Sequence, residues 1–149
     1  MAIKNYSSKQ RPNVTVGEIQ ALLADHGADK VMISYENKEP SAIAFQIEIN
    51  GRMVPFRLSI NAQGMLSVLK RGRGVARQYQ TIEQAKRTAW KCVYDWVAAQ
   101  VAMLEAAQSD AAQLFLGYAI LPDGKTVYES VDDIGFKKNS IDEKTKTIN

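Results

Sequence analysis

The chain has one cysteine and one histidine among its 149 residues, and this scarcity limits its chemistry. A single cysteine excludes an internal disulfide, and one cysteine with one histidine cannot supply the four ligands of a usual zinc site. Cys92 falls on the apolar side of a predicted helix and is expected as a small core residue. His26 precedes Gly27 at the end of another predicted helix, where a contact with the last carbonyls is favoured over catalysis.

The sequence motifs of several enzyme classes are also missing. There is no phosphate-binding G-x-x-x-x-G-K-[ST] loop, and Gly72-Arg-Gly74 lacks the strand-to-helix context of a dinucleotide site. No Asp-x-Asp or Glu-x-x-His pattern points to an acid and base pair. We therefore expect a protein that is not an enzyme and that uses no metal or cofactor.

Long apolar runs are absent. No stretch approaches the ~20 apolar residues that cross a bilayer. The N-terminal residues MAIKNYSSKQ lack the apolar region of a secretory signal. We expect a cytoplasmic protein with no membrane partner.

The organisation predicted along the chain is one domain with two loose ends. Residues 1–13 are polar, contain Pro12 and lack periodicity, so they are expected as a flexible arm. Residues 14–131 are expected as a single α+β domain. Residues 132–149 mix charges with few apolar side chains and are expected as a disordered tail.

Within the domain, a helix is expected first, opened by a capping box formed by Thr15 and Glu18. Alternating apolar residues over 31–35, 43–49 and 54–60 then predict three antiparallel strands. Asn50-Gly51 predicts a hairpin turn between the second and third strands. Pro55 indicates that the third strand lies at an edge or points its missing N–H outward.

Helices are predicted after the strands. A short helix is expected over 62–70 and a long one over 82–107, opened by a capping box at Thr81. The long helix is expected to bury the apolar residues of one stripe, namely Ile82, Ala85, Ala89, Cys92, Val93, Trp96, Met103 and Leu104. A third helix over 110–116, capped by Ser109, and a C-terminal hairpin turning at Pro122-Asp123-Gly124 complete the fold. The predicted class is α+β, a three-stranded antiparallel sheet packed against the long helix in the order α-β-β-β-α-α.

Positive charge is concentrated in one part of the chain. The whole chain carries +3, but residues 70–91 contain seven basic residues and one acid, so this stretch is +6 and the remainder −3. The basic segment, residues 70–77 (KRGRGVAR), contributes Lys70, Arg71, Arg73 and Arg77. Charges of one sign so close together repel one another, which favours an anionic partner. An acidic patch on another subunit is the alternative.

The beginning of the long helix is predicted to extend this basic surface. At 100° per residue, Lys86, Arg87, Trp90 and Tyr94 share a face opposite the apolar stripe, with Lys91 beside them. Basic and aromatic side chains together suit nucleic acid, because cations contact phosphates while rings stack on bases. Two alternatives stay open at this point: a face that is merely solvated, and a Trp90 and Tyr94 that are covered as part of the core.

Several short stretches between residues 2 and 130 are distinctive: Ala2-Ile-Lys-Asn-Tyr6, Gly17-Glu-Ile-Gln20, Pro55-Phe-Arg-Leu58, Ala89-Trp90, Asp95-Trp-Val97, Ala99-Gln100 and Phe115-Leu-Gly-Tyr118. Together they resemble a family of small proteins encoded in bacteriophages and prophages, although Gly117 stands where that family is expected to have proline. The resemblance implies a viral or mobile-element origin and a location in the cytoplasm of the host cell. It also implies an accessory role, such as nucleic-acid handling or interference with host defence.

The predicted order of elements, with a helix opening Thr81-Ile-Glu-Gln-Ala-Lys-Arg87 after three strands, is similar to that of double-stranded-RNA-binding domains and, in part, of single-strand annealing proteins. The first resemblance implies that Lys86 and Arg87 lie over phosphates, although residues 62–80 depart from that family's pattern.

The sequence thus leads to a non-enzymatic phage or mobile-element accessory protein that binds nucleic acid through Lys70, Arg71, Arg73, Arg77, Lys86, Arg87 and Lys91, with Trp90 or Tyr94 stacking on bases. The alternative is a counter-defence protein, expected as a homo-oligomer, that sequesters a nucleotide signal or blocks a host defence protein. A third hypothesis is a module that docks its basic segment on an acidic host protein.

Overall fold

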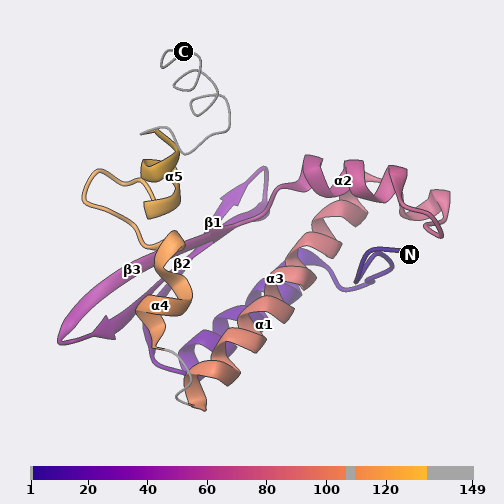
Figure 1. The fold of residues 1–149 in the computed structure, drawn as a ribbon. Coiled ribbons are helices and arrows are strands. Elements are labelled where there is room, and N and C mark those ends of the chain that lie inside the picture. Colours follow the sequence, from indigo (N-terminus) through magenta and orange to yellow (C-terminus); the bar gives the residue numbers. More distant parts are fainter. Residues whose placement is uncertain (1, 107–109, 134–149) are drawn as a thin grey trace, which may run out of the picture.

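The computed structural model of the chain describes residues 2–106 and 110–133 (Figure 1). Its elements, in chain order, are α1 (Pro12–Asp25), β1 (Ala28–Glu36), β2 (Glu39–Ile49), β3 (Arg52–Ser59), α2 (Ala62–Arg71), η1 (Arg77–Tyr79), α3 (Ile82–Glu105), α4 (Ala111–Phe115), η2 (Leu116–Tyr118) and α5 (Val127–Val131), where η denotes a 3₁₀ turn. The α+β class and the order of helix, three strands and long helix are confirmed.

The three strands form one antiparallel sheet in the order β1-β2-β3. Both connections are two-residue turns with positive φ at each position: 52° and 66° at Asn37-Lys38, and 52° and 79° at Asn50-Gly51. This backbone twist matches the twist of the flanking strands, and asparagine and glycine tolerate it best. The sheet order confirms the expectation from Pro55 that β3 is an edge strand.

One face of the sheet is covered by helices. Figure 1 shows α1 and α3 running side by side on the same side of the strands. The sheet contributes Ile43 and Phe45 of β2 and Phe56 of β3 to the core, and the Phe45 and Phe56 rings stack at 5.4 Å between centroids. These rings also contact Phe115 from the C-terminal part of the chain.

The buried side of α3 differs from the predicted stripe. Trp90, Val97 and Val101 are buried in the main core, and they lie within about 40° of one another at 100° per residue. Of the predicted stripe, Ala85 and Ala89 are buried, whereas Cys92, Val93 and Trp96 are only partly covered. Helix α3 is covered on several sides, so one apolar stripe does not describe its burial.

Residues 2–8, here called the N-terminal segment, pack along α3 although they were expected to be part of a loose arm. Gln84 Nε2 donates hydrogen bonds of 2.9 Å to the carbonyls of Tyr6 and Ser8, and Thr88 Oγ1 donates one of 2.9 Å to Asn5 O. Asn5 in turn donates to Asp95 at 2.8 Å. The polar side chains of α3 thereby satisfy backbone groups of the segment, a long-range pairing that sequence periodicity does not reveal.

The Asp95 carboxyl at this contact stays ionised more readily than usual. Burial acts to raise its pKa, but hydrogen bonds from Asn5 and Lys4 hold the pKa below its ordinary value.

Helix α1 begins earlier than predicted, and its capping box is absent. Pro12 occupies the first turn, where its missing N–H is not needed. Thr15 is buried inside the helix, and its hydroxyl lies 3.5 Å from Arg11 O. The other end agrees with expectation: His26 Nδ1 lies 2.8 Å from Leu22 O, and Gly27 has a φ of +104°.

The C-terminal part agrees with prediction only in places. Asp110 caps α4 through a 2.8 Å bond from Gln113 N, whereas the predicted cap, Ser109, lies outside the described residues. The turn at Pro122–Gly124 is present and leads to a single antiparallel bridge between Ile120 and Thr126. The expected second strand of the hairpin is instead α5, because Thr126 and Glu129 form a capping box that starts a helix. Most of the tail, residues 134–149, lies outside the described residues.

Candidate nucleic-acid interface

The basic segment joins α2 to η1 at one end of the molecule (Figure 1). Lys70 and Arg71 belong to the last turn of α2, where positive charge complements the helix dipole. The two glycines of the basic segment are required for different structural reasons. A Cβ on Gly72 would lie 3.0 Å from Val68 O and 3.2 Å from Val75 Cγ2, while Gly74 has a φ of +82°. One glycine permits close packing and the other a left-handed turn.

The backbone of the basic segment is anchored to a small second core. Val75 is buried with Leu69 of α2 and Ala85 of α3. Gln80 Nε2 donates a 3.1 Å hydrogen bond to Val75 O, and the Tyr79 ring packs edge-on against Tyr6 at 5.6 Å between centroids. The segment is therefore held at both its middle and its end, which orders the backbone beneath the arginines.

The cations of the segment are exposed. Lys70, Arg71, Arg73 and Arg77 all face solvent. Within the described parts of the chain, no carboxylate comes within ion-pair distance of any of the four. Their mutual repulsion is thus not offset by an acidic neighbour among residues 2–106 and 110–133.

The basic residues of α3 are not one exposed group with the segment. Lys86 Nζ lies 2.5 Å from Glu39 Oε2 of β2, so this predicted phosphate ligand is already paired. Lys91 Nζ lies 4.4 Å from the centre of the Tyr94 ring. Arg87 is half-buried and forms no ion pair with the described residues. Among the three basic residues of α3, Arg87 is the one for which the described residues show neither an ion pair nor an aromatic ring contact.

The predicted stacking platform is corrected by the structure. The Trp90 indole is fully buried in the main core, so its face cannot receive a base. Tyr94 is partly buried against the same core and carries Lys91 over its ring. The basic residues around Trp90 suggested an outward face, but the Lys86 side chain is partly buried and reaches Glu39 at the start of β2.

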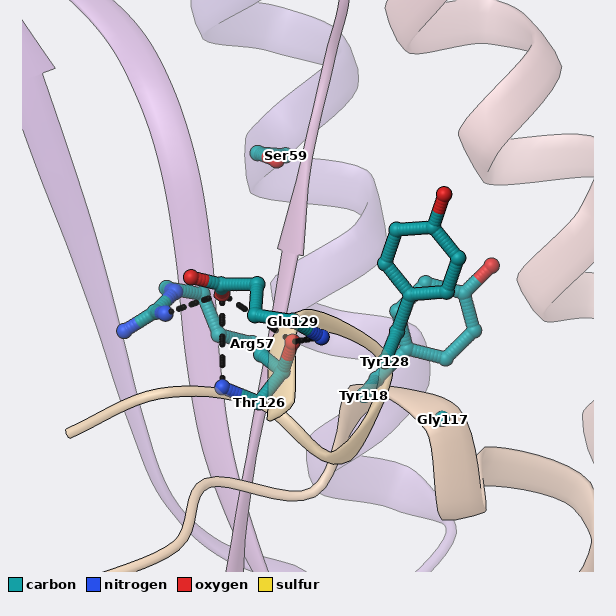
Figure 2. A pocket seen from close by; sticks show the side chains of 7 residues that line it. All are labelled: Arg57, Ser59, Gly117, Tyr118, Thr126, Tyr128 and Glu129. Atoms are coloured by element: carbon teal, nitrogen blue, oxygen red, sulfur yellow. Dashed lines mark hydrogen bonds and ion pairs between the residues drawn. The ribbon is translucent and has the colours of Figure 1, made fainter. Parts of the chain in front are cut away.

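A second polar region lies between β3 and the C-terminal residues. A hollow of about 540 Å³ is lined by Arg57, Ser59, Gly117, Tyr118, Thr126, Tyr128 and Glu129. Figure 2 shows these side chains. Arg57 Nη2 donates to Glu129 Oε1 at 2.9 Å, and both terminal nitrogens donate to Gly124 O at 3.3 Å. Glu129 Oε1 also accepts from the Thr126 hydroxyl at 3.0 Å and from its N–H at 3.3 Å. We call these three side chains the Arg57 network.

The charged side chains of this region pair with one another and connect the C-terminal residues to β3. Hydrogen bonds from the Thr126 hydroxyl and N–H, and then from Arg57, keep the pKa of Glu129 below its ordinary value. Lys125 forms an ion pair with Asp133 that raises the lysine pKa. The network fastens α5 to the edge of β3. The spacing of Thr126 and Glu129 was the sequence signal that could have identified it.

The described hollows do not include the basic segment. A second one, also about 540 Å³, lies on the sheet around Met32, Ala44, Gln46, Pro55 and Ile120. Two smaller ones lie beside Lys86 and beside Cys92, and none of these four is lined by Lys70, Arg71, Arg73 or Arg77. Across the described residues, no three metal-ligating side chains cluster. No described helix has the length and apolar character to cross a membrane.

Comparison of the chain with protein-family models, with curated proteins and with solved structures finds no match. The resemblance to phage-encoded proteins therefore stays a prediction, and a function can be proposed only from the geometry and charge of the molecule itself.

Proposed function

We propose that the protein binds nucleic acid through the phosphate backbone, using Lys70, Arg71, Arg73 and Arg77, with Arg87 of α3 as a further cation. The observation that carries this proposal is the basic segment itself: four exposed cations on an anchored backbone, with no carboxylate partner among the described residues. An ordered backbone loses less conformational entropy when its arginines engage phosphates.

The surroundings of the segment favour contacts to phosphates over contacts to bases. Trp90 is sealed in the core, Tyr94 lies beneath Lys91, and Tyr79 packs against Tyr6. Without an open ring, a single strand gains little from stacking. A duplex has a higher density of phosphate charge. We expect binding that tolerates any sequence, depends strongly on salt, and is at least as tight for duplex as for single strands.

The shape of the site supports an extended ligand over an enclosed small nucleotide. The four cations lie on open surface outside the hollows described above. A nucleotide-sequestering protein would enclose its ligand, since small-ligand sites are concave and bury most of the ligand surface. Sequestration of a nucleotide signal is therefore the alternative that the experiment tests.

The proposal is tested by fluorescence anisotropy with a labelled duplex and the matching single strand, at about 50 mM and about 200 mM salt. The Arg71→Glu/Arg73→Glu variant should weaken binding and lower the slope of log affinity against log salt by about 1.8, because two phosphate contacts are lost. Lys38→Glu/Arg52→Glu is the matched control, since it changes the net charge equally at two exposed positions in the hairpin turn and on β3.

Three outcomes decide between the hypotheses. Binding that falls with salt and is lost in the Arg71/Arg73 variant but kept in the control supports the proposal. Equal loss in both variants would mean that total charge alone is responsible and would contradict a site at this segment. No binding of the wild type at low salt, combined with a thermal shift caused by a cyclic dinucleotide, would replace the proposal with nucleotide sequestration.

A further inference from the structure

The two edges of the sheet differ in how far other segments of the described chain cover them. The edge of β3 is closed in its middle: Pro55 has no N–H to offer, Ile120 N donates to Pro55 O at 2.8 Å, and Phe56 forms a bridge with Ala119. Arg57 then ties the same strand to Gly124 and Glu129. Such covering is how proteins prevent edge strands from pairing with another chain.

The edge of β1 has no such cover. Among residues 2–106 and 110–133, no backbone group outside the sheet bonds to Ala28–Glu36. Met32 is 64% exposed and Tyr35 is 59% exposed on this strand. An uncovered strand of this length, with large apolar side chains in solvent, is a surface on which a further strand can pair.

The regular part of β1 is long enough for such pairing. Pairing with β2 shifts register between Ala28 and Lys30, where Asp29 is the extra residue, and between Ser34 and Tyr35. At the second shift the extra residue is Ser41 of β2, because Ser34 pairs with Ala42 and Tyr35 with Pro40. The stretch Lys30–Glu36 of β1 therefore carries no inserted residue, and its centre is Ile33.

This stretch is complementary to itself. We propose that two copies of the chain pair antiparallel along β1 around a twofold axis at Ile33, which joins their sheets into one of six strands. In this register Lys30 of one copy lies opposite Glu36 of the other, and the twofold axis creates that pair twice. Both side chains are exposed and neither has an ion-pair partner among the described residues.

The apolar residues agree with the same register. Val31 lies opposite Tyr35, and Ile33 lies opposite its own copy, so an aromatic and β-branched pair and an aliphatic pair meet on one face. Centring the axis on Met32 instead would place Lys30 opposite Ser34 and Glu36 opposite Ala28. Charge complementarity therefore selects Ile33, and the occupant of the edge is a second copy of this chain. The proposal does not depend on nucleic-acid binding.

The test is a charge swap read by size-exclusion chromatography with light scattering, from about 1 to about 100 μM protein. Nuclease treatment and the absorbance ratio ensure that no nucleic acid bridges the molecules. Wild type should be dimeric at the upper concentrations. Lys30→Glu places two glutamates opposite each other twice and should raise the dimer dissociation constant roughly tenfold or more. Glu36→Lys should do the same with two lysines.

The double variant Lys30→Glu/Glu36→Lys restores opposite charges and should restore the dimer, a recovery that a merely destabilised fold would not show. Arg52→Glu changes the charge on β3 and should leave the dimer unaffected. A wild type that is monomeric at every concentration would overturn the proposal. So would a dimer that persists unchanged in both single variants, since its interface would then lie elsewhere.

Discussion

The basic segment and the Arg57 network both carry exposed charges, but they use them in opposite ways. In the network, Arg57 is bonded to Glu129, and neighbouring Lys125 to Asp133, so the charges join the C-terminal residues to one another and to β3. In the segment, an apolar cluster of Leu69, Val75 and Ala85 holds the backbone, and the cations form no ion pair with the residues that the structure describes.

This contrast separates charge that supports the fold from charge that is available to a partner. Each exposed ion pair contributes only about 0–1 kcal/mol, so the paired and unpaired arrangements differ modestly in folding free energy. What differs is the field outside the molecule: paired charges cancel within a few ångströms, whereas unpaired cations attract an anionic partner. Three sets of substitutions and one pH titration test this distinction, in order of decreasing expected effect.

The largest effect is expected where the basic segment is anchored. Leu69→Ala should lower the free energy of unfolding by about 2–5 kcal/mol, because a fully buried side chain leaves a cavity beneath the segment. The same substitution at Leu116, which is 57% exposed beside the Arg57 network, should change stability by no more than about 0.5 kcal/mol. Urea unfolding of both variants measures the difference. Equal values would show that the second core does not anchor the segment.

A smaller effect is expected in the Arg57 network. Thr126→Ala removes the hydroxyl that accepts from Glu129 N at 3.2 Å and donates to Glu129 Oε1, and should cost about 1 kcal/mol. Thr126→Ser keeps the hydroxyl and should retain most of the stability. Thermal unfolding of the three proteins compares them. An alanine variant as stable as wild type would mean that the network does not hold the C-terminal residues.

The sequence was sufficient for the parts of the fold that local rules govern. Strand alternation, the Asn50-Gly51 turn and the Thr81 cap predicted the sheet and the start of α3. Thr81 Oγ1 accepts from Gln84 N at 3.2 Å, but the Gln84 side chain donates to the N-terminal segment, so only half of the predicted capping box is shown. It was not sufficient for which side of α3 is buried. That choice depends on three neighbours, α1, α2 and the N-terminal segment, whose positions no periodicity encodes.

The candidate site was likewise predictable only where it depends on local sequence. The basic segment is consecutive in sequence, so its exposure and charge survive as predicted, whereas Lys86 and Trp90 depend on where α3 meets the sheet. The open edge of β1 could not be foreseen either, because an edge is defined by which segments fail to cover it.

A still smaller effect on stability is expected from the charges of the basic segment. Arg71→Glu/Arg73→Glu should lower the free energy of unfolding by less than about 1 kcal/mol, because these exposed charges have no ion-pair partner among the described residues and only Arg71 lies in the last turn of α2, where it interacts weakly with the helix dipole. Urea unfolding at low salt provides the measurement. A loss of several kcal/mol would place the arginines among the structural charges and remove the contrast with the Arg57 network.

The smallest and most local difference concerns pH. Glu129 has a pKa below its ordinary value, so it stabilises the fold at pH values above the unfolded pKa of about 4.3, and this stabilisation is lost as the pH falls through the folded pKa. Protonation also removes the acceptor that holds Arg57 and caps α5.

In an NMR titration from neutral to acid, the amide signals of Thr126 and Val127 should shift with a midpoint below about 4.3. Those of Arg73 to Val75 should not follow that midpoint, since no carboxylate among the described residues pairs with the segment's cations. A shared midpoint in both regions would show that they are electrostatically coupled, and the segment's charges would then not be independent of the fold.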